Sequence, residues 1–259
     1  MIWAFLLGIV QAITEFLPIS SSAHLLITPW LFDFPRQGLA FDAALHLGTS
    51  LALLLFFWRD FWGMIQKRDK FLWYILIASI PGAAIGFFGD KLIEQYLHEG
   101  SLAILIAAIG MILMTGVIWY VDATAKLKKD LTQMTRKEAF WVGLAQALAL
   151  IPGMSRSGAT IAAGLAAGYT REAAARFSFL IGTPIALGAG LYKATDIIQA
   201  QPSSSEVMQL IIGVVTAAIL GFAVIRWLLG YVQKHSLRVF LIYRLVFAST
   251  VIIIWLLRS

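Results

Sequence analysis

The sequence contains no cysteine and few charged residues, and both shortages exclude classes of protein. Without cysteine the chain has neither disulfides nor thiolate metal sites. Charged residues make up 13% of the chain and hydrophobic residues 60%, whereas soluble domains have about 25% and about 45–50%. A water-soluble globule cannot cover so much apolar surface, and a disordered chain would be far less hydrophobic. The composition therefore predicts a protein that crosses a membrane several times.

Basic residues are missing from the start of the chain. Residues 1–35 contain no Lys or Arg, and the first basic residue is Arg36. A secretory signal begins with a basic segment, so we expect no removable targeting segment here. The net charge of +6 then indicates loops that face anionic membrane lipids, and it does not indicate a nucleic-acid partner.

Long apolar runs are abundant. A bilayer core of about 30 Å requires about 20 helical residues. Six segments reach this length: roughly Leu39–Trp58, Phe71–Gly89, Leu102–Val121, Phe177–Ala194, Val207–Trp227 and Arg238–Leu257. They predict six transmembrane helices. Away from the two residues at each end of these segments, the charged residues and histidines inside them are Asp42 and His46 in the first and Arg244 in the last.

Four further apolar segments are too short to span a bilayer alone. They are Ile2–Leu17, Ser21–Phe32, Ala139–Ile151 and Gly158–Gly168. Each adjacent pair is interrupted by a proline and a polar cluster, at residues 18–24 and 152–158. This pattern predicts two re-entrant hairpins, whose broken tips lie inside protein or reach a wet cavity. The alternative is that each pair forms one kinked span or two ordinary short spans.

The two breaks resemble each other in sequence. Gly8-Ile9-Val10-Gln11-Ala12 aligns with Gly143-Leu144-Ala145-Gln146-Ala147, and with a one-residue gap Pro18…Ser21 aligns with Pro152…Ser155. Each half then holds one hairpin followed by three full spans. Because three is odd, the second half enters the membrane inverted relative to the first.

The expected fold is therefore an all-α polytopic membrane protein with ten helical segments in an inverted repeat. We expect the first repeat to cover residues 1–125 and the second to cover residues 126–259, within a single membrane domain. Inverted repeats place the functional site near the membrane midplane, where the two halves meet.

The distribution of basic residues predicts the orientation. Fourteen of the 20 Lys and Arg residues fall on one side, between residues 59–70, 126–137, 171–176 and 226–238. The other side holds Arg36, Lys91, Lys193 and Arg258. The positive-inside rule then places both termini outside. The first hairpin enters from outside and the second from the cytoplasm, so their tips can meet.

Polar residues gather at the two breaks. Ionisable groups inside a membrane cost about 2.5–3.5 kcal/mol each on insertion scales, and they are functional candidates by default. Gln11 and Glu15 share one helix face just before the first break. The remaining candidates at the two breaks are Ser20, Ser21, Ser22, His24, Ser155, Arg156, Ser157 and Thr160.

These residue types suit an anion site with catalytic groups. Helix N-termini and an arginine fork bind phosphate, and the hydroxyls supply donors and a nucleophile. His24 and Glu15 can transfer protons, or Glu15 can help to hold a divalent cation. Structural alternatives remain open: serines bonded to backbone, His24 as a core residue, and a Glu15–Arg156 ion pair. Asp42 and His46, one helical turn apart, either line the site entrance or cap and staple their helix.

At these residues the sequence resembles a known family. The segment from Gln11 to His24 is similar to the first signature of the bacterial undecaprenyl-diphosphatase family of the bacitracin-resistance type, which reads Glu or Gln, three residues, then Glu. The segment Pro152–Thr160 resembles its second signature, Pro-Gly-x-Ser-Arg-Ser-x-x-Thr. The similarity runs along the whole chain and includes Ser79-Ile80-Pro81-Gly82. Gln11 stands where many members have Glu, which weakens any prediction of two carboxylates holding a metal.

The resemblance implies an inner-membrane enzyme that converts the C55 isoprenoid diphosphate to the monophosphate carrier lipid, releases phosphate and so recycles the lipid for cell-wall synthesis. It also implies a divalent cation, Mg²⁺ or Ca²⁺, which Glu15 is one candidate to hold. By motif position Ser21 is the nucleophile, Glu15 and His24 are its acid/base and orienting partners, and Arg156 is the phosphate clamp. The implied supporting donors are Ser20, Ser22, Ser155, Ser157 and Thr160. Gln11, Asp42 and His46 are supporting candidates because of their positions in the sequence.

Several alternatives stay open at this point. Within the enzyme reading, His24 either activates water directly or is itself the nucleophile. From another class, the inverted-repeat plan also suits a transporter that flips a lipid phosphate across the bilayer, and a third option is an ion channel. The oligomeric state is open as well, with a homodimer as one option.

Overall fold

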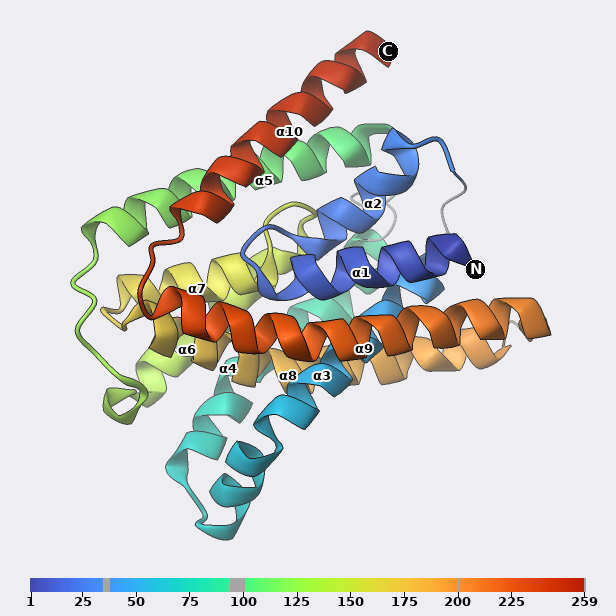
Figure 1. Ribbon diagram of the computed structural model, residues 1–259. Coiled ribbons are helices and arrows are strands. Elements are labelled where there is room, and N and C mark those ends of the chain that lie inside the picture. The colour runs from blue at the N-terminus through green and yellow to red at the C-terminus, as the bar shows by residue number, and fades with distance from the viewer. Residues whose placement is uncertain (35–37, 94–100, 200, 259) are drawn as a thin grey trace.

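The computed structural model describes residues 1–34, 38–93, 101–199 and 201–258, and within these ranges the chain is helical apart from its connections and one isolated bridge between Lys129 and Tyr169. The helices are α1 (Ile2–Phe16), α2 (Ser21–Leu31), α3 (Leu39–Gln66), α4 (Lys70–Ile93), α5 (Ser101–Thr124), η2 (Leu131–Gln133), α6 (Arg136–Gln146), η3 (Ala147–Leu150), α7 (Arg156–Ala166), α8 (Arg171–Gln199), α9 (Ser204–Val232) and α10 (Arg238–Arg258) (Figure 1).

Six of the described helices are long and apolar enough to cross a membrane: α3, α4, α5, α8, α9 and α10. They coincide with the six predicted spans, so the prediction of an all-α, multi-pass membrane protein is confirmed. Some helices continue beyond the apolar run that predicted them. α8 begins at Arg171, where Thr170 Oγ1 accepts a hydrogen bond of 3.2 Å from the Ala173 amide. The arginines of its first turns are paired: Arg171 Nε lies 2.6 Å from Asp122 Oδ1, and Arg176 forms an ion pair with Asp60.

The four short helices form two hairpins, as predicted. α1 and α2 turn back on each other at residues 17–20, and α6, η3 and α7 do so at residues 151–155. The hairpins approach from opposite ends of the molecule, and their tips face each other in the middle (Figure 1). A hydrogen bond of 2.9 Å from Ser157 Oγ to the Leu17 carbonyl joins them. The predicted meeting of the two tips is therefore confirmed.

The order of elements is the same in both halves: a hairpin and then three long helices. α2 and α7 each have 11 residues, and each follows a serine in the left-handed region, Ser20 with φ 75° and Ser155 with φ 68°. The offset that relates Gly8 to Gly143 therefore also relates Ser20 to Ser155 without a gap. The alignment had needed a gap because it matched the prolines, which occupy different places in the two breaks.

Close backbone approaches bring the first hairpin and α3 against α9. A Cβ atom on Gly8 would lie 2.9 Å from the Gly213 carbonyl oxygen, and one on Gly48 would lie 2.5 Å from the Val214 carbonyl oxygen. Small residues at such contacts let membrane helices pack tightly. Because α1 and α3 share the surface of α9, the polar residues of α1 face the start of α3.

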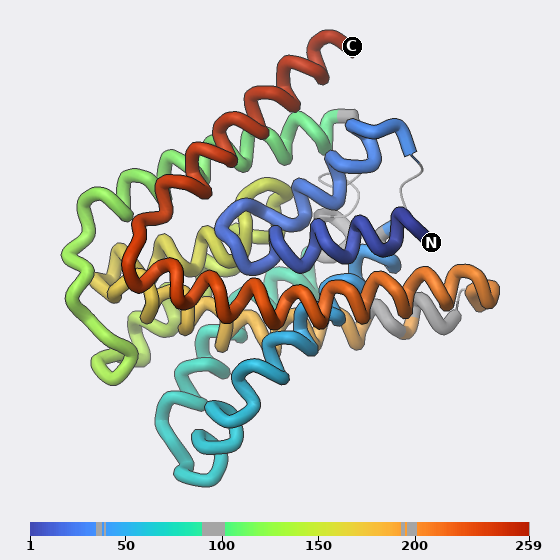
Figure 2. Tube along the Cα trace, in the orientation of Figure 1, coloured from blue at the N-terminus to red at the C-terminus, as the bar shows by residue number. Residues whose placement is uncertain are grey.

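Both termini lie at the same side of the bundle, away from the connection between α5 and α6 (Figure 2). The lysines of that connection, Lys126, Lys128 and Lys129, are thus separated from the termini, as the predicted orientation requires. Which side faces the cytoplasm stays a prediction, and Arg36, which counts toward it, lies outside the described residues.

Candidate active site

Glu15, buried at the end of α1, lies at the centre of the candidate site. Its Oε2 accepts a hydrogen bond of 2.6 Å from Ser21 Oγ, and its Oε1 lies 2.7 Å from Arg156 Nη2. Ser21 and Arg156 are the first residues of α2 and α7. The two hairpins thus deliver a hydroxyl and a guanidinium from equivalent helix starts to the two oxygens of one carboxylate.

Gln11 of α1 and His46 of α3 contact the same carboxylate. His46 Nδ1 lies 3.2 Å from Glu15 Oε2, and Gln11 Nε2 lies 2.9 Å from His46 Nδ1 and 3.2 Å from Glu15 Oε2. Thr49, which the sequence did not single out, is 3.4 Å from the same amide nitrogen. Asp42 lies one helical turn earlier on α3. His46 is thus placed beside Glu15, and whether the pair lines the site entrance stays a prediction.

His24 is oriented differently from the expectation. Its Nδ1 is 2.7 Å from the Ser20 carbonyl oxygen and its Nε2 is 2.8 Å from the Tyr243 hydroxyl, while its ring stacks on Phe247 at 4.5 Å. Both ring nitrogens are thus engaged away from Ser21. Among the described contacts, the Ser21 hydroxyl has Glu15 as its partner, and the acid/base role of His24 stays a prediction.

The remaining candidate hydroxyls hold the two breaks together. Ser155 Oγ accepts a hydrogen bond of 3.0 Å from the Gly158 amide and lies 3.1 Å from Ser157 Oγ. Thr160 Oγ1 donates to the Arg156 carbonyl at 2.7 Å and is 2.6 Å from Ser178 Oγ. At the first break Ser20 Oγ and Ser22 Oγ lie 3.3 Å apart. These contacts are those of the structural alternative, and a role of Ser155, Ser157 and Thr160 in phosphate binding stays a prediction.

Arg156 fits into a recess of α8. Its Nη1 donates a hydrogen bond of 3.2 Å to the Ser178 carbonyl, and a Cβ atom on Gly182 would lie 1.6 Å from that nitrogen. The guanidinium of Arg156 therefore packs directly against the backbone at Gly182. It can lie there because glycine has no side chain.

Gly182→Ala is expected to displace Arg156 and to lower turnover by about 10²-fold, because a shift of about 1 Å in a positioning group can cost that much. Steady-state rates of phosphate release, measured beside thermal unfolding in detergent, test this expectation. Gly188→Ala is the matched control, since it lies on the same helix and a Cβ atom there meets nothing within 4 Å. Equal losses in both variants would contradict the proposed packing role.

Comparison with known proteins identifies the family. The family model described as "Bacitracin resistance protein BacA" matches residues 4–250. The chain belongs to this family. It is 42% identical over 261 residues to an undecaprenyl-diphosphatase of Desulforudis audaxviator (strain MP104C), covering 98% of this chain and 97% of that protein. A protein of the same name from Thermomicrobium roseum is 41% identical over 271 residues, with 98% of each chain covered. One from Caldicellulosiruptor bescii is 42% identical over 266 residues, with 99% and 98% covered.

The resemblance read from the two signatures is thereby confirmed. Both signatures fall inside the matched range, and the relatives cover nearly the whole of this BacA family member. The geometry adds what the signatures do not contain: the first and second signatures meet at Glu15 through Ser21 and Arg156.

The second half carries only a remnant of this cluster. Gln146 occupies the place that Gln11 occupies in the first half, and it is buried with neither amide atom hydrogen-bonded among the described residues. At the place that corresponds to Glu15 the chain has Leu150. The two halves therefore differ in chemistry, and the carboxylate lies in the first half alone.

The donors around Glu15 partly suit a divalent cation. The described residues contain no group of three or more His, Cys, Asp or Glu side chains that could hold a metal ion. However, Gln11 Oε1 is buried without a hydrogen-bond partner in the described part of the chain, close to the Glu15 carboxylate. Mg²⁺ is often bound by one or two carboxylates together with substrate phosphates. These residues thus fit a cation shared with a phosphate substrate, and they do not form a complete protein cage.

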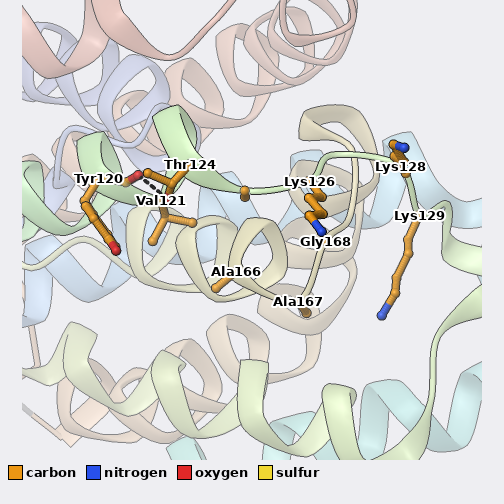
Figure 3. Close-up of a pocket in the computed structure, with 10 residues that line it drawn as sticks. Tyr120, Val121, Thr124, Lys126, Lys128, Lys129, Ala166, Ala167 and Gly168 are labelled. Atoms are coloured by element: carbon orange, nitrogen blue, oxygen red, sulfur yellow. Dashed lines mark hydrogen bonds between the residues drawn. The ribbon is translucent and has the colours of Figure 1, made fainter.

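A pocket of about 620 Å³ lies apart from this cluster, at the end of α5 (Figure 3). It is lined by Tyr120, Val121, Thr124, Ala125, Lys126, Lys128, Lys129, Ala166, Ala167 and Gly168. None of the candidate catalytic residues is among them. The pocket belongs to the lysine-rich connection between α5 and α6, and the chemistry of the candidate site is carried by the buried cluster at the hairpin tips.

Proposed function

We propose that this protein hydrolyses undecaprenyl diphosphate to undecaprenyl phosphate and inorganic phosphate, and so recycles the carrier lipid for cell-wall synthesis in the bacterial inner membrane. The observation that carries the proposal is the convergence of Ser21 and Arg156 on Glu15. The family membership and the names of the relatives support the same substrate. A site within a bundle of membrane-spanning helices lets the prenyl tail remain among lipids while its diphosphate reaches polar groups.

The proposed first step is an in-line displacement by Ser21. Its Oγ attacks the terminal phosphorus while Glu15 Oε2, already its hydrogen-bond acceptor at 2.6 Å, takes the proton. The bond from the terminal phosphorus to the bridging oxygen breaks, and undecaprenyl phosphate leaves. Water then attacks the phosphoseryl phosphorus and the bond from phosphorus to Ser21 Oγ breaks. Ser21 Oγ takes back the proton held by Glu15, and inorganic phosphate leaves with the hydroxyl and the second proton of the water.

Arg156 and the starts of α2 and α7 would stabilise the negative charge of the transferring group. A guanidinium has five N–H donors, and two of the groups that Arg156 contacts are Glu15 and the Ser178 carbonyl. Further donors can face a phosphate, together with the free amides at the two helix N-termini. Because Arg156 lies beside Glu15, it also offsets the repulsion between the Glu15 carboxylate and the substrate.

A divalent cation is part of the proposal. Glu15 and Gln11 Oε1 would hold it together with oxygens of the diphosphate, and a bound Mg²⁺ or Ca²⁺ would neutralise charge on the leaving phosphate. We also propose that both termini lie outside the cytoplasm, following the distribution of Lys and Arg. A homodimer stays a prediction.

The direct test is phosphate release by the purified protein in detergent, supplied with polyprenyl diphosphate. Release of inorganic phosphate together with polyprenyl monophosphate supports the proposal. A lipid-phosphate flippase would release none, but it would move intact lipid between the leaflets of reconstituted vesicles. That pair of results would overturn the hydrolase assignment.

Arg156→Lys is expected to lower kcat/KM by about 10²–10³-fold, which is the effect of removing one well-placed donor from an oxyanion site. Lysine keeps the positive charge but loses the planar fork that reaches Glu15, Ser178 and the phosphate together. Arg171→Lys, which alters an ion pair with Asp122 at the start of α8, is the matched control and should retain activity. Activity near wild type in Arg156→Lys would remove Arg156 as the phosphate clamp.

A further inference from the structure

Arg244 connects the tips of both hairpins. It lies within α10 and is fully buried. Its Nη1 donates a hydrogen bond of 2.8 Å to the Pro18 carbonyl, and its Nη2 donates one of 2.8 Å to the Gly153 carbonyl. One side chain thus binds the loop that precedes α2 and the loop that precedes α7.

The two carbonyls occupy equivalent places in the two halves. Pro18 lies three residues before Ser21, the first residue of α2, and Gly153 lies three residues before Arg156, the first residue of α7. The distance between the two carbonyls is set by the width of one guanidinium. The same side chain therefore fixes how far apart the nucleophile and the proposed phosphate clamp begin their helices.

The other edge of Arg244 is anchored to α5. Nε donates 2.9 Å to Thr115 Oγ1, and Nη2 lies 3.1 Å from the Met111 carbonyl. The second tip also lies directly on α5, because Gly153 has φ +88° and a Cβ atom there would be 1.9 Å from the Ala107 carbonyl oxygen. α5 packs against α10 (Figure 1). The α5–α10 pair is thus the platform on which both tips are fixed.

Within the described part of the chain, the guanidinium of Arg244 donates to three carbonyls and one hydroxyl. Burial of a charge without an opposite charge is unfavourable, and a well-packed apolar side chain often stabilises a core at least as well. If Arg244 only filled space in the core, an apolar side chain would serve as well as a guanidinium. A planar group with several donors in a fixed fork is, however, what a bridge between two separate carbonyls requires.

We propose that Arg244 is a positioning residue for the phosphatase reaction: by joining the two hairpin tips it holds Ser21 and Arg156 at the two oxygens of Glu15. The inference rests on the proposed function for its catalytic consequence. It assigns Arg244 no contact with the substrate, so its effect passes through Ser21 and Arg156.

The experiment compares Arg244→Lys and Arg244→Ala with Arg258→Lys. Arg258 lies on the same helix and bonds the Trp30 carbonyl and Asp33 at an exposed end of α10, so it is a matched control. Hydrogen–deuterium exchange is followed in peptides that cover residues 17–20 and 151–155. In parallel, kcat, KM and thermal unfolding are measured in detergent.

We expect Arg244→Lys to remain folded, to exchange faster at both tips together, and to lose about 10²-fold in kcat with little change in KM. Lysine fails because one ammonium cannot reproduce the fork. In Arg244→Ala, added guanidinium ions should occupy the vacated space and restore part of kcat, whereas ammonium ions should not. Arg258→Lys should behave as wild type in every measurement.

Other outcomes would overturn the inference. Three results would exclude the proposal that Arg244 joins the two tips. They are unchanged hydrogen exchange at both tips, a change at one tip alone, and an equal effect of Arg258→Lys. Faster exchange throughout all helices, without rescue by guanidinium, would assign Arg244 to general folding. If the wild-type protein released no phosphate from polyprenyl diphosphate, the proposed function would fail. Hydrogen exchange at the two tips would still show whether Arg244 joins them.

Discussion

Ser21→Ala is expected to reduce phosphate release by roughly 10⁴- to 10⁶-fold, the scale of loss when a covalent nucleophile is removed. The reason is geometric: Ser21 Oγ is the hydroxyl that donates to Glu15, and it lies at the first residue of α2. Substrate labelled in its terminal phosphate, quenched in acid, should label the wild-type protein and leave Ser21→Ala unlabelled. Initial rates of phosphate release measure the loss.

Thr250→Ala provides the control. This exposed hydroxyl of α10 donates to the Val246 carbonyl at 2.9 Å, away from the site, so its removal should leave the rate and the labelling close to wild type. Substantial turnover by Ser21→Ala would instead favour a mechanism without the phosphoserine. The attacking group would then be water or His24, and His24 would first have to leave Tyr243 and the Ser20 carbonyl.

Glu15→Gln is expected to lower kcat by about 10²–10⁴-fold, the usual contribution of a general base. The amide is nearly the same size as the carboxylate, but it cannot take the proton of Ser21. It also leaves Arg156 without its anionic partner at 2.7 Å. Because breaking a buried ion pair costs about 3–5 kcal/mol, the free energy of unfolding should fall as well. Rates of phosphate release and denaturant titrations in detergent measure the two effects.

Glu206→Gln is the control for this change. Glu206 is an exposed carboxylate that caps the start of α9 through Ser203, and its replacement should leave turnover unchanged. The double variant Glu15→Gln/Arg156→Met separates the two effects of Glu15. It should recover stability because no unpaired cation remains, and it should remain inactive. If Glu15→Gln alone turned over substrate at the wild-type rate, Glu15 would be a structural partner of Arg156 and not the base.

Most of the fold could be predicted from the sequence because the bilayer imposes lengths. A span needs about 20 apolar residues, so α3, α4, α5, α8, α9 and α10 were recognisable, and the short pairs around residues 18 and 152 stood out. The residues at which helices begin were harder to predict from the sequence. The second helix of the second hairpin was expected to begin at Gly158 but begins at Arg156. It begins there because Ser155 adopts a left-handed backbone conformation, and the sequence gives no sign that a serine will do so.

The candidate site was predictable where the repeat carried the information. Similar breaks that approach from opposite sides implied that Ser21 and Arg156 meet, and they do so on Glu15. The orientation of His24 was not predictable, because its partner Tyr243 comes from α10, 219 residues away in sequence. The roles of Gly182 and Arg244 were hidden for the same reason. Each depends on a contact between helices that no local pattern encodes.

The equivalence of Ser21 and Arg156 has an evolutionary consequence. If the two halves descend from one duplicated ancestor, that ancestor presented the same residue twice at this place. Two hydroxyls or two guanidiniums could then flank the centre, but never one of each. Division of labour between nucleophile and cation would have begun only after the two copies became a single gene and mutated independently.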